Sequence, residues 1–175
     1  MAHGRGRRGR CRELSPRRGR RAETVKEIEA LGRRAKAYSA SVENWDEDQA
    51  MVADVLRDFG GVGILVNNAG IASRGQSVAD TDPAEMERVV RVHAFGPHYH
   101  SKLVVPHMRG EGRGDIVMIS SVATLGMGPR GAPYNMGKAA MEALALTLAK
   151  EERQHGIRTK HRLAGADDDG DGPPP

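Results

Sequence analysis

The sequence predicts an α/β domain with a doubly wound parallel sheet, and two observations carry this prediction. Between residues 22 and 158, helical and strand-like hydrophobic patterns alternate in the order α-β-α-β-α-β-α, which implies crossovers between parallel strands. Unusual polar and glycine residues also follow the strand candidates directly. In sheets of this kind, ligands bind at the carboxyl ends of the strands.

The first half of this span predicts two helices with a short strand between them. Residues 22–31 form a helical pattern that stops at Gly32, and its apolar stripe consists of Val25, Ile28 and Leu31. Residues 36–42 are a strand candidate. A helix over residues 46–59 opens with Asp46 as its expected N-cap. The expected core face of this helix consists of Met51, Val52, Val55, Leu56 and Phe59.

The second half predicts two buried strands and two longer helices. Residues 62–70 begin with a short apolar run of the kind that is buried on both faces of a sheet. A long helix begins after Asp82, and Pro97 is expected to kink it by removing a backbone donor. Residues 114–121 are the second buried strand, and residues 133–155 form the last helix.

Composition limits the class of protein. The 175 residues suit one domain, and a 38% hydrophobic content with only 3% aromatics predicts an aliphatic core. Cys11 is the single cysteine, so an intrachain disulfide is excluded and a reducing, cytoplasmic setting is expected. The sequence contains no apolar run long enough to cross a membrane.

The two ends differ from the middle in charge. Residues 1–21 contain nine arginines and predict a basic disordered tail, whereas residues 159–175 contain four clustered aspartates and predict an acidic, Pro-rich disordered tail. The expected domain therefore occupies residues 22–158. Arginine clusters can hold nucleic acid through phosphate contacts, but no folded reading motif accompanies this one, so nucleic-acid binding would be nonspecific.

Polar residues with catalytic chemistry gather at the predicted strand ends. Tyr134 and Lys138 lie four residues apart on a predicted helix and therefore share a face. A neighbouring ammonium favours an ionised phenol, which can exchange a proton with an alcohol or a carbonyl. Ser121 lies thirteen residues before Tyr134, whereas Ser120 is interpreted as a strand-end residue.

The combination of Asn-Asn-Ala-Gly, Ile-Ser-Ser and Tyr-x-x-x-Lys closely resembles the classical short-chain dehydrogenase/reductases, including members of the 3-oxoacyl-[acyl-carrier-protein] reductase type. The resemblance covers residues 22–158 and implies a Rossmann-like sheet. It assigns substrate orientation to Ser121, proton exchange to Tyr134, and binding of the nicotinamide ribose to Lys138. It places the cofactor's adenosine half beside Asn67, Ala69 and Gly70.

Two positions inside the span depart from the family pattern. His93 stands where the family commonly has an asparagine that helps to hold a proton-relay water, and a ring nitrogen of the histidine could replace it. Ser41 stands near the expected adenine site, where the family often has an aspartate.

The ends depart further, so the resemblance implies an incomplete domain. Gly4, Gly6 and Gly9 match G-x-G-x-x-G, but no strand can precede them, so the first strand and the glycine-rich loop are expected to be absent. The sixth strand is expected to be disrupted. With suitable synonymous codons, a one-base shift turns residues 159–172 into TNIVSPALTTTEM and residues 11–18 into VANYRRDA. Both hidden readings suit the family, so we hypothesise that both tails are frameshifted translations.

The resemblance implies an oxidoreductase that uses NADP or NAD. The arginines of the hidden reading VANYRRDA favour NADP. The implied substrate is a small alcohol or carbonyl compound, either a 3-oxoacyl thioester or a secondary alcohol. Family members commonly form homodimers or homotetramers through their two long helices. The alternative is an inactive remnant of the family. Because no carboxylate or cysteine stands at metal-ligand spacing with His98, His100 or His107, we assign no metal.

Overall fold

The structure, a computed structural model, describes residues 16–165. The chain divides into two units, residues 1–39 and residues 40–175, and each is described on its own. Predictions that concern residues 1–15 and 166–175, among them the reading of Gly4, Gly6 and Gly9, lie outside the described residues.

The first unit contains the helix α1, Pro16–Ala30. The helix begins at Pro16, six residues before the helical pattern predicted from residue 22, and includes residues assigned to the basic tail. Arginine is a good helix former, and proline is well tolerated in the first turn of a helix. Ile28 and Leu31, expected on a packing stripe, are exposed.

The second unit opens with α2, Trp45–Phe59. Its N-cap is Asn44, whose side-chain oxygen accepts hydrogen bonds from the backbone N–H groups of Asp46 and Glu47 at 3.1 and 3.3 Å. The prediction of Asp46 as the cap is therefore wrong by two residues. Residues 36–42, predicted as a strand, are not part of the three-stranded sheet.

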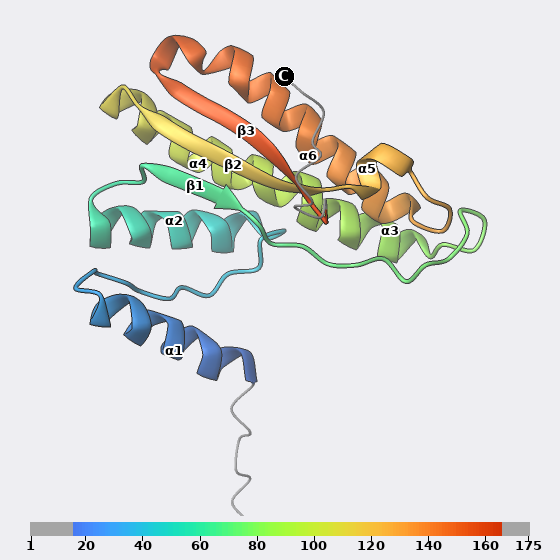
Figure 1. The fold of residues 1–175 in the computed structure, drawn as a ribbon, viewed down its shortest axis with the longest axis horizontal. Coiled ribbons are helices and arrows are strands. Elements are labelled where there is room, and N and C mark those ends of the chain that lie inside the picture. Colours follow the sequence, from blue (N-terminus) through green and yellow to red (C-terminus); the bar gives the residue numbers. More distant parts are fainter. Residues whose placement is uncertain (1–15, 166–175) are drawn as a thin grey trace, which may run out of the picture. The chain divides into compact units, whose positions relative to one another are not determined.

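Three parallel strands form the sheet in the order β1-β2-β3 (Figure 1). They are β1, Ile64–Asn67, β2, Gly114–Ser121, and β3, Ile157–Ala164. The α/β class and the bounds of β2 agree with the sequence prediction. Ile64 and Val66 point to the face opposite Leu65, which packs against the core, and remain 65% and 53% exposed, so the prediction that this strand is buried on both faces is wrong.

The sixth strand was expected to be disrupted beyond residue 158, but the chain forms the continuous strand β3 there. It pairs with β2 along its whole length, from Ile157 opposite Gly114 to Ala164 opposite Ser121. Parallel pairing uses backbone groups, and an edge strand tolerates charged side chains. The Arg158 side chain is exposed, and its Nε forms an ion pair with Asp115 Oδ1 at 2.8 Å.

The predicted long helix is divided by a π-helical turn. Asp82 caps α3, Pro83–Val90, by accepting a hydrogen bond from the backbone N–H of Ala84 at 2.9 Å. The π-helical segment η1, Arg91–Phe95, follows and leads into α4, Gly96–Glu111, with Pro97 in its first turn. The helix is therefore distorted near Pro97, as expected, but by a π-helical turn over the residues that precede the proline. Turns of this kind often mark functional sites.

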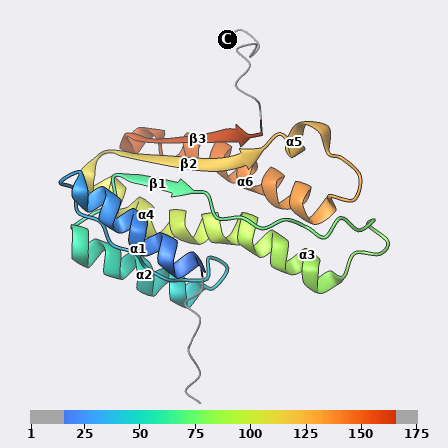
Figure 2. The same cartoon turned by 60° about the horizontal axis from the view of Figure 1, so that its bottom comes forward.

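The helices α4 and α6, Ala132–Glu151, pack against one face of the sheet, and α2 packs against α4 (Figure 2). The short elements α5, Ala123–Gly126, and η2, Arg153–His155, flank α6 in the sequence. The buried aliphatic core that results consists of Val52, Val104, Val105, Met108, Ile116, Met118, Met141, Ala145, Leu148 and Ile157. This core holds the carboxyl ends of the strands beside the start of α6.

Candidate active site

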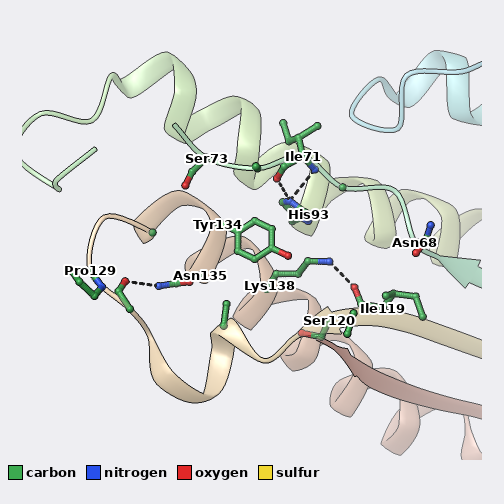
Figure 3. A pocket seen from close by; sticks show the side chains of 16 residues that line it. Asn68, Ile71, Ser73, His93, Ile119, Ser120, Pro129, Tyr134, Asn135 and Lys138 are labelled. Atoms are coloured by element: carbon green, nitrogen blue, oxygen red, sulfur yellow. Dashed lines mark hydrogen bonds between the residues drawn. The ribbon is translucent and has the colours of Figure 1, made fainter. Parts of the chain in front are cut away.

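A pocket of about 730 Å³ lies beyond the carboxyl end of β2. Its walls come from the segment after β1, from η1, from the end of β2 and from the first turns of α6 (Figure 3). Four residues predicted for the site line it together, namely Gly70, His93, Tyr134 and Lys138. They come from three separate segments, namely the loop after β1, η1 and α6, so the fold brings them together.

Tyr134 and Lys138 share the pocket face of α6, as the four-residue spacing predicted. The Lys138 Nζ lies 5.8 Å from the centroid of the Tyr134 ring and donates a hydrogen bond to the Ile119 carbonyl at 2.5 Å. Burial lowers the pKa of the Lys138 ammonium from its usual value, and the carboxylate of Glu142 opposes this shift. The carbonyl of Ile119 therefore holds a buried cation beside a half-buried phenol.

His93 is fully buried between the loop after β1 and the Tyr134 ring. Its Nε2 faces two backbone groups of Ile71, the carbonyl oxygen at 2.8 Å and the N–H at 3.3 Å. The shorter contact favours a proton on Nε2, which then donates to the carbonyl. Its Nδ1 is buried without a hydrogen-bond partner. Burial, together with the charge of Lys138, lowers the pKa of the imidazole, whereas the bond to Ile71 opposes this shift. His93 is therefore neutral near pH 7 and presents an unused acceptor.

Two glycines make room for the His93 side chain. A Cβ added to Gly137 would stand 2.8 Å from the His93 Cβ, and one added to Gly70 would stand 2.8 Å from the His93 Cε1. Real Cβ atoms do not approach this closely. Any side chain at position 93 therefore requires glycine at 137 on α6, and the imidazole ring requires glycine at 70 after β1.

The two serines at the end of β2 have different surroundings. Ser120 lines the pocket, is buried, and donates a hydrogen bond to Glu142. Ser121 is not among the lining residues, and its Oγ accepts a hydrogen bond from the backbone N–H of Ala123 at 3.2 Å. Ser120 therefore lies on the pocket wall, whereas the family resemblance assigns the oxygen-orienting role to Ser121.

The other predicted cofactor residues lie apart from this pocket. Asn67 and Ala69 line a separate cavity of about 40 Å³, and Asn68 lines both. Ser41 lines neither; it is exposed, and its backbone N–H donates to Glu47 Oε2 at 2.8 Å.

A buried polar chain beside Asn67 was missed by the sequence analysis. Asp48 is fully buried and lies 3.0 Å from the Nε2 of His100, whose Nδ1 lies 3.1 Å from Asn67 Oδ1. Burial raises the pKa of the Asp48 carboxyl, and His100 opposes the shift. The two partners are 52 residues apart, so no local pattern could have revealed them.

Asn135 is a second residue that the sequence analysis did not select. It is buried on α6 and donates a hydrogen bond to the Gly128 carbonyl at 3.2 Å. The loop that it holds contains Met127 and Arg130 with positive φ angles of 44° and 61°. Asn135 thus fixes a loop whose Gly128, Pro129 and Gly131 form one wall of the pocket.

Within residues 16–165, no cluster of three or more histidine, cysteine or acidic side chains is arranged to hold a metal ion. The helices in that range include none that is long and apolar enough to span a membrane.

Comparison with known proteins gives consistent matches. The family model described as short chain dehydrogenase matches residues 10–166. An uncharacterized oxidoreductase of Thermotoga maritima is 36% identical over 136 residues, which cover 78% of this chain and 53% of that protein. The chain spans about half the length of the curated relatives it matches.

Solved structures show the same likeness. A metagenomic short-chain oxidoreductase in complex with NADP has a TM-score of 0.76 and 30% identity, covering 80% of this chain and 63% of that one. An NAD⁺-bound xylitol dehydrogenase has a TM-score of 0.78 and 28% identity, covering 82% of this chain and 55% of that one. This chain therefore corresponds to part of each of these structures.

Proposed function

This chain belongs to the short-chain dehydrogenase family, and we propose that its pocket serves an NAD(P)-dependent oxidoreductase that interconverts a secondary alcohol and a ketone. The substrate class includes 3-oxoacyl thioesters. One observation carries the proposal: Tyr134, Lys138 and His93 meet on the wall of one pocket at the carboxyl edge of the sheet.

The residues around the pocket fit the nicotinamide end of a dinucleotide. Lys138 supplies a buried ammonium for ribose hydroxyls, and Gly70 supplies a wall without a side chain. The phosphate end is different, because within residues 16–165 no strand leads through a glycine-rich turn into a helix before β1. When bound, a nicotinamide cofactor supplies or takes up a hydride at the substrate carbon.

The chain's own residues account for the proton. Tyr134 holds a proton at its phenolic oxygen and exchanges it with the substrate oxygen. The Lys138 ammonium favours the ionised phenol after the proton has left. His93 takes the place of the family's asparagine: its neutral Nδ1 accepts a hydrogen bond from a relay water in the pocket.

Substrate orientation is assigned to Ser121 by family resemblance, whereas Ser120 is the serine on the pocket wall. Paired variants separate them. If Ser121 orients the substrate oxygen, Ser121→Ala lowers turnover, whereas Ser120→Ala only removes the hydrogen bond to Glu142. The reverse result would move the role to Ser120.

Cofactor binding tests the proposal directly. NADPH and NADH are titrated into the full chain at moderate salt, and binding is followed by cofactor fluorescence. We expect saturable binding of one or both nucleotides, reduced in Lys138→Met. A folded wild-type chain that binds neither nucleotide would support the inactive remnant. Retention on DNA that is lost at high salt, with no nucleotide binding, would instead support a basic nucleic-acid-binding tail.

A further inference from the structure

Three polar side chains from three different elements form a chain at the edge of the candidate site. Asp48 comes from the first turn of α2, His100 from α4 and Asn67 from the end of β1. The imidazole of His100 bridges the other two, at 3.0 Å from Asp48 Oδ1 and 3.1 Å from Asn67 Oδ1.

Counting donors and acceptors ties the charge of His100 to that of Asp48. The amide oxygen of Asn67 only accepts, so Nδ1 donates to it, and Asp48 Oδ1 accepts from Nε2 when the carboxyl is ionised. The amide of Asn67 is held in this orientation by its other end, because its Nδ2 donates to the thioether of Met118 at 3.2 Å. A thioether sulfur accepts but cannot donate, so turning the amide over would leave its oxygen without a donor there.

The surroundings favour a cation on this ring. The second oxygen of Asp48, Oδ2, is buried without a partner, so a proton placed on it would find no acceptor. Glu43, before α2, and Glu47, in its first turn, add negative charge that raises the pKa of Asp48 and so helps to keep a proton on the Asp48–His100 pair. The remaining neighbours of the cavity beside His100 are apolar or amide groups, including Val66, Asn68 and Pro97.

We propose that His100 is an imidazolium paired with Asp48, and that this pair is a positioning device for the amide of Asn67. When the ring loses its Nδ1 proton, the amide rotates and donates to Nδ1, and its bond to Met118 is lost. Asn67 ends the strand that leads into the pocket, so the state of the pair sets the backbone approach of Asn68 and Gly70. Asn68 and Gly70 line the pocket, so this positioning would also change the affinity for the cofactor. Only the effect on cofactor affinity rests on the proposed function.

Nitrogen-15 NMR of the histidine rings in the full-length chain tests the charge. We expect both ring nitrogens of His100 to be protonated at neutral pH, and the side-chain amide signal of Asn67 to move with the His100 titration. In Asp48→Asn, His100 should lose a proton at neutral pH. A His100 ring with one unprotonated nitrogen in the wild-type chain at neutral pH would overturn the proposal.

Cofactor titration tests the positioning role separately. His100→Gln should weaken nucleotide binding by about tenfold, roughly the loss of one charged hydrogen bond. The matched variant His98→Gln, at an exposed position on the same helix, should bind as the wild type does. Unchanged affinity in His100→Gln would refute the positioning role. If the wild type bound no nucleotide, the proposed function would fail, while the NMR result would still decide the charge of His100.

Discussion

The imidazole of His93 stands edge-on to the phenol ring of Tyr134, with ring centroids 5.1 Å apart and an angle of 81° between the planes. This contact joins η1 to the first turn of α6 and places a neutral, half-satisfied histidine beside the proposed proton donor. His93, which departs from the family pattern, is therefore in direct contact with Tyr134, which matches it.

Substituting Gly137 tests the space that His93 requires. Gly137→Ala should lower the free energy of unfolding by about 1–3 kcal/mol, because the new Cβ would meet the His93 Cβ in a filled core. Gly110→Ala is the matched control, since Gly110 lies in α4 with open space around it and should gain about 0.5 kcal/mol from helix propensity. Equal effects in chemical denaturation would contradict this packing.

The buried state of His93 predicts a pH dependence of stability. Its pKa is lower in the folded chain than the usual 6.5, chiefly because of burial. As the pH falls below about 6.5, the unfolded chain binds a proton that the folded chain does not, so stability decreases, by at most about 1.4 kcal/mol per pH unit. His93→Asn should lose less stability than the wild type between pH 8 and pH 5. If the free energy of unfolding fell equally with pH in both proteins, burial would not lower the pKa of His93.

The open strand β1 predicts association in solution. Ile64 is 65% exposed on an edge strand, whereas its neighbour Leu65 points the other way and packs against the core. Ile64→Thr should raise solubility and change the free energy of unfolding by less than about 0.5 kcal/mol. Leu65→Thr should cost about 2 kcal/mol. The edge account would be wrong if the Ile64 variant precipitated at the same concentration as the wild type.

Local signals explain what could be predicted from the sequence. The bounds of β2 follow from a short apolar run, and the shared face of Tyr134 and Lys138 follows from helical spacing. The cap at Asp82 was likewise readable from the proline after it.

Contacts between distant segments explain what could not be predicted. Asp48 and His100 meet only because α2 packs against α4, and the exposure of Ile64 depends on what covers its face of the sheet. The strand β3 was missed because its side chains are mostly exposed and charged, so its stability comes from backbone pairing with β2.

The tails remain a proposal that nucleotide sequencing can test. We propose that residues near both ends are translated from shifted frames around an in-frame centre. The family match over residues 10–166 includes residues 10–21 of the first tail and residues 159–166 of the second. Sequencing of the gene should reveal a single-base change near the codons for Cys11 and Lys160. Unbroken single-frame DNA, with peptide masses that match residues 1–21 and 159–175, would refute the frameshift.

The measurement that tests the central claim most directly is deuterium transfer from the labelled nicotinamide ring to a ketone or 3-oxoacyl thioester, catalysed by the full-length chain. The proposed site predicts transfer to the carbonyl carbon in the wild type and its loss in Tyr134→Phe, while the thermal transition stays unchanged. A wild-type chain that binds the cofactor, unfolds cooperatively and transfers no deuterium, or a Tyr134→Phe variant that transfers it equally well, would contradict the claim that this pocket is an oxidoreductase site.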